Sequence, residues 1–391
     1  MSNDWLGVLG GGQLGRMFCH AAQRLGYRVC VLDPVRDGPA GAVAERQIVA
    51  AYDDPQALDQ LGELCIAITT EFENVPAQSL ARLAGSRPVR PDAGAVAIAQ
   101  DRAREKAFLR QCGVDVAPHA AIDAAAAFAT LDDALFPGIL KTARLGYDGK
   151  GQVGVASREE ARTAWDRLGC VPCVLEKRLP LRRELSVIVA RGADGAKVVY
   201  PAVENEHRDG ILAVSTMPAR VSDAAAWSAQ DIALRIAEGL SYVGVLCVEM
   251  FLVEDPARPD GRLVANEMAP RPHNSGHATI DACSVSQFEQ QARVLAGLPL
   301  GEARLLSPAV MLNLLGDVWF EANGAARSPP FHEVLAVPGA CLHLYGKLEA
   351  RRGRKMGHVT VLGESVEQAH SRAAQVANIL DIEAPRTPSG H

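Results

Sequence analysis

The twelve residues from Asn266 to His277 concentrate side chains that can bind anions, hold a metal or move protons. The segment holds one carboxylate, one guanidinium, two imidazoles and several short polar groups, and Pro270, Pro272 and Gly276 interrupt it. The prolines exclude a continuous helix and keep the backbone extended or turned. Polar groups at this density, directly after an apolar strand, indicate a functional site; the alternative is a surface loop rich in hydrogen bonds.

Two apolar runs around this point predict a β-hairpin that brings two acids together. Residues 245–253 contain a single acid, Glu249, and residues 262–269 contain Glu267, with a connection rich in Pro, Asp and Gly between them. Glu249 then lies opposite Asn266 or Glu267, because the register is uncertain by one residue. Acids in apolar strands are costly unless a cation meets them, so a shared divalent metal explains the pair. Oxygen ligands of this kind suit Mg²⁺, which bridges to substrate phosphates.

The composition limits the class of protein. The 391 residues suffice for two or three domains, and 48% hydrophobic with 22% charged residues is ordinary for a globular chain. The net charge of −6 gives no support for a nucleic-acid partner, and no apolar run reaches the length of a membrane span. The nine cysteines are scattered and lie mostly in apolar segments. We therefore expect a cytoplasmic protein with free thiols and small-molecule partners.

The N-terminus has the pattern of a nucleotide-binding βαβ unit. An apolar strand at 5–9 leads into the glycine turn Gly10–Gly15, an amphipathic helix to Leu25, and a strand at 27–32 that ends before Asp33. This satisfies the G-x-G-x-x-G pattern of NAD sites. The glycines themselves require only a tight turn and backbone amides that any anion can use.

Polar residues also follow the strand predicted at 66–70. Glu73 and Asn74 stand at its carboxyl end, where open α/β sheets bind ligands; the alternative is a cluster that caps a helix. The charged stretch 100–110 is strongly helical and opens a second region of the chain. Taken alone, charges on such a helix usually form a solvated face.

A lysine and a glycine-rich loop follow in this second region. Lys141 is a cation in the otherwise apolar strand 136–142, and residues 144–152 contain closely spaced glycines. Amides of such a loop can wrap phosphate oxygens, and Lys150 adds charge. The loop lacks the Walker spacing, which excludes a P-loop; the alternative is an exposed hairpin tip.

Further along the chain, strands alternate with short connections. Strands are predicted at 173–179 and 183–189, His207 precedes a turn, and a helix capped by Ser228 is expected to run to Leu240.

The last region begins near residue 300 and contains a compact basic turn. Residues 347–355 place five cations in nine residues, between strands predicted at 340–345 and 359–362. In an acidic protein such a turn indicates a site for a phosphate-sized anion; the alternative is a solvated charge cluster. The tail after Ala384 is expected to be disordered.

The acid-bearing strand, the strand ending in Asn-Glu and the arginine after it resemble the metal site of the ATP-grasp ligases. Within that superfamily, the segment Asn266–His277 is similar to the 5-(carboxyamino)imidazole ribonucleotide synthases of purine biosynthesis, and the likeness extends over residues 5–380. It implies an α/β protein with a Rossmann-like N-terminal domain at 1–99. An ATP-grasp domain follows at 100–300, of α+β type with a small lobe at about 115–190, and then a small β-rich C-terminal domain at 301–391.

The resemblance also implies a reaction. Bicarbonate, ATP and 5-aminoimidazole ribonucleotide give ADP, phosphate and the N-carboxylated nucleotide through carboxyphosphate, with Mg²⁺ on Glu249 and Glu267. Arg271 is the implied clamp for bicarbonate, and His273 is either a proton acceptor or an orienting group. A homodimer follows from the resemblance alone.

The implied site residues fall into three groups. The catalytic residues are Lys141, Tyr147, Arg271 and His273. The ATP-binding residues are Arg102, Lys141, Gly146, Tyr147, Asp148, Gly149, Lys150, Gly151, Gln152, Glu176, Lys177, Arg178, Leu179, Glu184, His207, Asn266 and Glu267. The residues that bind the ribonucleotide are Gln13, Leu14, Glu73, Asn74, Asn274, Ser275, Lys347, Arg354 and Lys355. The family has proline where this chain has Arg352, which leaves open which cation of the basic turn points inward.

Two alternatives stay open at this stage. A relative in the superfamily would ligate formate or an amino acid, and the His-Asn-Ser-Gly-His string argues against it. The glycine turn alternatively marks an NAD-dependent oxidoreductase or a non-catalytic nucleotide sensor. A sensor should have lost one of the two metal acids, and both are present.

Overall fold

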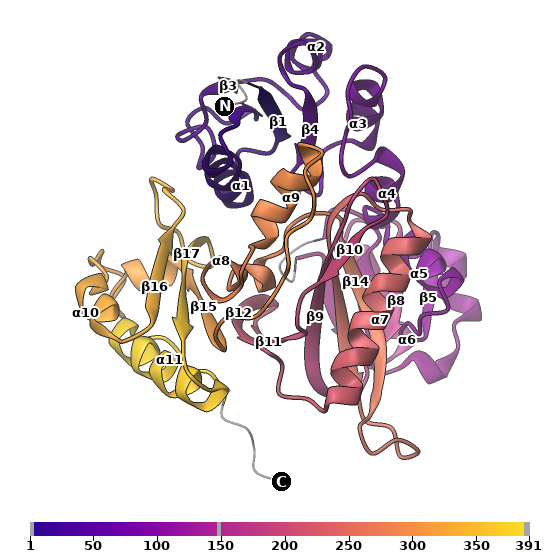
Figure 1. Cartoon of the computed structure of the whole chain (residues 1–391). Helices are drawn as coiled ribbons and strands as arrows, with labels where there is room; N and C mark the ends of the chain where they lie inside the picture. The colour runs from indigo at the N-terminus through magenta and orange to yellow at the C-terminus, as the bar shows by residue number, and fades with distance from the viewer. Residues whose placement is uncertain (1–3, 147–149, 387–391) are drawn as a thin grey trace.

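Alternating apolar strands and helices at the N-terminus build a parallel sheet with helices on both faces (Figure 1). The computed structural model describes residues 4–146 and 150–386, and the strand order in this part is β3-β2-β1-β4. Side chains alternate between the two faces of each strand, so Leu6 and Val8 pack toward α1 whereas Leu9 packs toward α2. The elements are β1 (Trp5–Leu9), α1 (Gln13–Arg24), β2 (Arg28–Leu32), β3 (Arg46–Ile48), α2 (Pro55–Leu64), β4 (Ala67–Thr70), α3 (Ala77–Ala84) and α4 (Ala93–Ala99).

A second sheet, antiparallel, forms the small lobe. Its strand order among the described residues is β5-β8-β6-β7, and its core is built around Trp165 and Phe128. The elements are β5 (His119–Ile122), β6 (Gly138–Thr142), β7 (Gln152–Val155), α6 (Arg158–Arg167) and β8 (Cys173–Lys177). Residues 181–190, expected to belong to this lobe, instead form most of β9 in the large sheet.

The large sheet joins the grasp region to the C-terminal region. In the described residues its order is β14-β13-β9-β11-β12-β15-β17-β16, with β10 on the edge of β9. Strands β12 and β15 pair directly, with Val214 opposite Leu312, so the C-terminal strands extend the same sheet. The elements are α5 (Arg102–Gln111), β9 (Leu181–Arg191), β10 (Lys197–Val199), β11 (Val203–Arg208), β12 (Ile211–Met217), α7 (Asp223–Gly239), β13 (Gly244–Val253), β14 (Arg262–Ala269), α8 (Thr279–Ala282), α9 (Gln287–Leu295), β15 (Ala309–Leu315), α10 (Phe331–Ala336), β16 (Ala340–Leu344), β17 (Lys355–Leu362) and α11 (Val366–Leu380).

Helix α9 connects the N-terminal sheet to the large sheet (Figure 1). Its Phe288 and Ala292 belong to the apolar cluster that contains Phe18 of α1. Its Gln291 accepts a hydrogen bond from the backbone N–H of Val245 on β13 and donates one to Thr69 on β4. The buried amide of Gln291 thereby ties the two sheets together.

The start of α7 and the C-terminal tail differ from the expectations or extend beyond the described residues. The helix predicted from Ser228 begins earlier, at Asp223, because Ser222 accepts the N–H of Ala225 and is the actual cap. In the tail, Arg208 donates to the carbonyl of Ala384, and the N–H of Arg386 donates to Glu206. Residues 387–391 lie outside the described part, so the prediction of disorder stays untested there.

Candidate active site

A cavity of about 590 Å³ lies between the glycine turn of the N-terminal sheet and the polar end of β14. The predicted site residues that line it are Gln13, Leu14, Glu73, Asn74, Arg102, Gly146, Glu267, Arg271, His273, Asn274 and Lys355. These residues are far apart in sequence, and the fold brings them together. The alternative of a surface loop at 266–277 is wrong, because Asn274, Ser275 and His277 are buried.

The two acids of the predicted hairpin face each other directly. Glu249 on β13 pairs with Glu267 on β14, and the register shifts at the next position, so Asn266 is the extra residue on its strand. Burial and the neighbouring Glu267 raise the pKa of Glu249 to about 7. Burial also opposes ionisation of Glu267, but its 2.7 Å ion pair with Arg102 outweighs it and lowers that pKa to about 2. One acid of the pair is thus firmly ionised, and the other is poised to ionise when a cation arrives.

Buried charges from three elements surround this pair. Lys141 on β6 lies 3.1 Å from Glu176 and 3.5 Å from the amide oxygen of Asn266. Lys106 of α5 contacts the other oxygen of Glu176 at 3.1 Å, and both lysines are buried. Glu176 therefore acts here as a bridge between two lysines, which hold its pKa below the usual range although burial opposes this.

Arg271 is held at the cavity wall by Glu73. The two side chains form an ion pair, and the guanidinium also donates to the carbonyl of Pro272 at 3.0 Å. Its Nε atom is buried and has no hydrogen-bond partner among the described residues. Glu73 does not cap α3, whose N-terminus has no side-chain cap, so the capping alternative is wrong.

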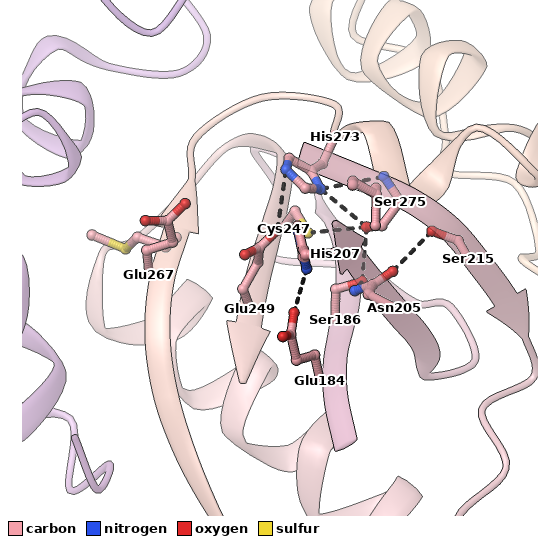
Figure 2. A network of polar contacts seen from close by, with 12 residues as sticks. Glu184, Ser186, Asn205, His207, Ser215, Cys247, Glu249, Glu267, His273 and Ser275 are labelled. Atoms are coloured by element: carbon pink, nitrogen blue, oxygen red, sulfur yellow. Dashed lines mark hydrogen bonds and ion pairs between the residues drawn. The ribbon is translucent and has the colours of Figure 1, made fainter. Parts of the chain in front are cut away.

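His273 lies next to Glu249 (Figure 2). Its Nε2 is 3.3 Å from Glu249 Oε1, and its Nδ1 contacts the hydroxyl of Ser275 at 3.0 Å. Burial, reinforced by Arg271 and Lys355, lowers the pKa of His273 to about 3. Ser275, predicted to touch substrate, is fully buried behind the histidine and is not among the residues that line the cavity.

A second cavity, of about 240 Å³, contains Glu184 and His207, two of the predicted ATP-binding residues. Their side chains hydrogen-bond to each other (Figure 2). Burial would lower the pKa of His207, but this bond and the nearby acids raise it. The predicted adenine linker, Glu176, Lys177 and Leu179, spans the end of β8 and lines neither cavity, and neither does Arg178 within it.

The loop predicted to cover the phosphates is described in part. Gly146 lines the large cavity, and the carbonyl of Gly151 accepts the N–H of Thr142 at 2.8 Å. Lys150 precedes Gly151, and Gln152 begins β7. The predicted residues Tyr147, Asp148 and Gly149 lie outside the described residues.

The three predicted cations of the basic turn have different surroundings. Lys355 lines the large cavity. The ammonium of Lys347 donates to the carbonyl of Lys355 at 2.5 Å and lies over the ring of Tyr345. Arg354 donates to the carbonyl of Glu349 at 2.9 Å and does not line the cavity.

Under the NAD interpretation, the carboxylate of Asp33, the acid after β2, should bind a ribose hydroxyl. In the structure this carboxylate instead accepts hydrogen bonds from the protein. Asp33 accepts the N–H of Gly11 at 2.5 Å, the N–H of Val35 at 2.8 Å and the hydroxyl of Tyr52 at 2.6 Å. A Cβ on Gly15 would lie 2.3 Å from the carbonyl of Gly10, so the turn requires glycine there for close packing. The glycine pattern is therefore explained by the packing of a tight turn against Asp33, and it does not require a bound NAD.

Sequence reasoning missed three buried charged residues around the site. Glu105 and Lys106 lie on the charged helix α5, and Glu71 follows β4; each is at most 5% exposed. For Glu105 and Lys106 the interpretation as a solvated face is wrong, since Glu105 accepts the N–H of Met268 at 2.6 Å. For Glu71, its position in the sequence could have indicated that it is part of the site. It directly follows the buried strand β4 and is two residues from Glu73.

We expect Glu71→Gln to weaken the dependence of stability on pH. Burial raises the pKa of Glu71 from 4.5 to about 8, and neither carboxylate oxygen has a hydrogen-bond partner among the described residues. The folded state therefore binds more protons than the unfolded state, and stability is lost as pH rises from about 5 toward about 8. Denaturant unfolding across this range should show a flatter decline for Glu71→Gln, whereas the exposed Glu63→Gln should follow the wild type. Parallel declines for all three proteins would contradict this assignment.

Comparison with known proteins places the chain in a family. The sequence profiles of the ribonucleotide synthetase preATP-grasp domain, the ATP-grasp domain and the phosphoribosylaminoimidazole carboxylase C-terminal domain match residues 4–100, 107–288 and 309–372. An N5-carboxyaminoimidazole ribonucleotide synthase of Brucella melitensis is 47% identical over 91% of this chain and 95% of its own length. The chain belongs to the N5-carboxyaminoimidazole ribonucleotide synthase family.

Other members of this family agree in sequence and in structure. The synthase of Bacillus subtilis is 40% identical over 93% of this chain and 92% of its own length. The solved structure of the synthetase from Thermus thermophilus has a TM-score of 0.86 at 39% identity and covers 98% of this chain and all of that one. A synthase from Aspergillus clavatus, in complex with ADP and 5-aminoimidazole ribonucleotide, has a TM-score of 0.86 at 32% identity, over 97% and 99% of the two chains.

Family membership confirms several predictions made from the sequence. The chain is an ATP-grasp ligase with the expected preATP-grasp and C-terminal regions, and the oxidoreductase and formate-ligase alternatives are excluded. Within residues 4–146 and 150–386, every helix is too short or too polar to cross a membrane.

Proposed function

We propose that this chain carboxylates 5-aminoimidazole ribonucleotide with bicarbonate, driven by ATP, and that the residues around the large cavity carry out the chemistry. The observation that supports this most is the composition of one cavity wall. Glu267, Arg271 and His273 stand beside Gln13 and Lys355, so a metal-binding acid and an anion clamp share one space with the predicted nucleotide residues. The relatives' names and the Aspergillus clavatus complex support the same reaction.

The described residues fit a magnesium ion at the hairpin. Glu249 and Glu267 present oxygens from adjacent strands, and Asn266 adds an amide oxygen at the register shift. No cluster of three or more His, Cys, Asp or Glu side chains suited to a metal occurs in the described ranges, so ATP phosphates would complete the coordination. When bound, Mg²⁺ supplies positive charge against the phosphate oxygens.

The protein's own cations then make the transfer of the γ-phosphoryl group possible. Attack of a bicarbonate oxygen on the γ-phosphorus breaks its bond to ADP and gives carboxyphosphate, which brings anions together. Lys141, fixed by Glu176, and Arg102, fixed by Glu267, offset this charge without having to reorganise. Arg271 presents a planar fork that matches bicarbonate, and its buried Nε supplies one of the donors.

The second half of the reaction needs a closed space. Carboxyphosphate breaks down to phosphate and CO2, and the exocyclic amine of the ribonucleotide forms the new carbon–nitrogen bond to CO2. Water would otherwise hydrolyse the intermediate, so placing both half-reactions in a cavity between two sheets is an advantage. A neutral His273 at the wall orients Glu249. The phosphate released from carboxyphosphate takes up the proton that the amine loses.

Phosphate release tests the proposed function. Purified protein is given ATP, Mg²⁺ and bicarbonate, with and without 5-aminoimidazole ribonucleotide, and the N-carboxylated product is followed in parallel. We expect phosphate release to rise on addition of the ribonucleotide and to equal product formation. Release that ignores both the ribonucleotide and bicarbonate would refute the proposal.

We expect Lys355→Ala to raise the apparent constant for the ribonucleotide roughly 10-fold, about 1.4 kcal/mol, because Lys355 is the cation of the basic turn in the cavity wall. The constant for ATP should change little, since a remote phosphate positions the ribonucleotide alone. Arg354→Ala is the matched variant from the same turn, and its bond to Glu349 predicts a smaller rise. If Lys355→Ala changed the apparent constants for ATP and for the ribonucleotide equally, the basic turn would be a solvated charge cluster and not a phosphate site.

The cellular setting is also a proposal. All nine cysteines are free in the described part of the chain, in agreement with a reducing cytoplasm. We further propose a homodimer, which sedimentation of the purified protein would test directly.

A further inference from the structure

A continuous row of buried polar side chains leads from His273 into the large sheet (Figure 2). His273 Nδ1 lies 3.0 Å from Ser275 Oγ, which lies 2.7 Å from Ser186 Oγ on β9. The row continues through Asn205 on β11 to Ser215 on β12, with 2.9 Å at each step. The two serines nearest the histidine are fully buried and the outer two residues nearly so, so each of their hydrogens needs an acceptor inside the protein.

One backbone amide sets the direction of every hydrogen bond in this row. The N–H of Ser275 donates to His273 Nδ1 at 3.3 Å, and a backbone N–H cannot accept. Nδ1 therefore carries no proton, and the Ser275 hydroxyl must donate to it as well. That hydroxyl has one hydrogen, so its oxygen accepts from Ser186, and Ser186 accepts from the amide NH2 of Asn205. The amide oxygen of Asn205 then accepts from Ser215.

The same reasoning assigns the tautomer of His273. Because Nδ1 accepts hydrogen bonds, the ring is neutral and its proton is on Nε2. Nε2 faces Glu249 Oε1 at 3.3 Å, so the N–H is directed at a carboxylate of the proposed metal site. The other tautomer would set a nitrogen lone pair against that carboxylate and a ring N–H against the N–H of Ser275. The contact between the two N–H groups would be repulsive whatever the charge of Glu249, and the contact with Glu249 would be repulsive when that acid is ionised.

We propose that Ser275 and Ser186, oriented by Asn205, are positioning residues that fix the ring of His273, in its Nε2–H tautomer, with the N–H directed at Glu249. Hydrogen bonds to the far nitrogen of a histidine commonly set the orientation of the groups at such a site. Ser186 lies opposite Glu249 in the sheet, so the pairing of β9 with β13 fixes the position of both the acid and this member of the row. This inference deepens the proposed function and rests on it only for the role of His273 and Glu249 in carboxylation.

Nitrogen NMR of protein labelled with nitrogen-15 histidine reads the tautomer without any substrate. Loss of its signals in His273→Gln assigns His273. We expect wild-type His273 to show an unprotonated Nδ1 and a protonated Nε2. In Ser275→Ala the backbone N–H still faces Nδ1, so the tautomer should persist, and the nitrogen-15 signal of Nδ1 should shift because the hydrogen bond from the hydroxyl is lost. A wild-type ring protonated at Nδ1, or at both nitrogens, would overturn the proposal.

Kinetics separate positioning from a merely structural role. Ser275→Ala should lower kcat about tenfold, the effect of one buried hydrogen bond, with the KM for ATP nearly unchanged. Ser186→Ala, one link further from the ring, should lower kcat less. The control is Thr216→Val, which removes a buried hydroxyl on β12 that bonds His370 instead, and it should leave kcat unchanged.

The kinetic measurements and the NMR measurement allow the positioning role and the proposed function to be contradicted separately. Equal losses of kcat in Ser275→Ala and Thr216→Val would overturn the positioning role, because both variants then act through stability. Absence of turnover dependent on the ribonucleotide in the wild type would refute the proposed function, whereas the ring nitrogens would still decide the tautomer.

Discussion

Glu267→Gln is expected to abolish ATP-dependent phosphate release while the protein stays folded. Glutamine has the same shape, but it removes the negative charge that meets Arg102 and the proposed magnesium ion. Glu267 lines the large cavity and is ionised at any working pH, since its pKa is lowered to about 2. Loss of one charged ligand from a metal that clamps a triphosphate removes several kcal/mol of transition-state stabilisation. Glu249→Gln should have nearly the same effect.

The matched control is on the same hairpin. Glu254 is exposed just after β13, away from both cavities, so Glu254→Gln should retain wild-type turnover. Turnover is measured at saturating Mg²⁺, and circular dichroism verifies the fold of each variant. Near-normal ATP hydrolysis in Glu267→Gln would remove the metal assignment.

Arg271→Lys is expected to raise the apparent constant for bicarbonate by about 10- to 100-fold, because lysine retains the charge but loses the two-pronged donor set. Lysine cannot donate to Pro272, pair with Glu73 and also present a buried Nε, as the arginine does. The constant for ATP should change far less. Bicarbonate and ATP are therefore varied separately in the phosphate-release assay.

A second arginine controls for the substitution itself. Arg262 on β14 pairs with Asp115 at 3.0 Å and lines neither cavity, so Arg262→Lys should leave both constants unchanged. If Arg271→Lys instead weakens ATP binding and spares bicarbonate, Arg271 belongs to the nucleotide site and the proposed clamp is lost.

Local patterns in the sequence predicted the parts of the site that lie close together along the chain. The hairpin that pairs Glu249 with the end of β14 was predicted, because alternation and turn residues act over a few positions. Its register stayed open between Asn266 and Glu267, and a register shift at Asn266 settled it. No local signal specifies such a shift, since it depends on how β14 pairs with β13.

Helix boundaries show the same limit. Asp54 and Asp101 cap α2 and α5 as their residue types favour, yet Ser222 rather than Ser228 caps α7. Both serines are suitable caps, and packing of Ala226 and Ala229 against the large sheet decides between them. Competing local signals are thus resolved by burial that involves strands far away in the sequence.

The sequence by itself determined the family, the glycine turn, the acid-bearing hairpin and the anion-binding character of the 266–277 segment, because residue type and short spacing carry these properties. Tertiary structure alone decided which charges are buried. Lys106 meets Glu176, and Glu105 meets the backbone of Met268, across separations that no periodicity encodes. It also decided that the C-terminal strands extend the large sheet and that Ser275 faces His273 instead of the cavity. The physical reason is shared: buried polar groups must find partners, and only the packed chain determines which partners are within reach.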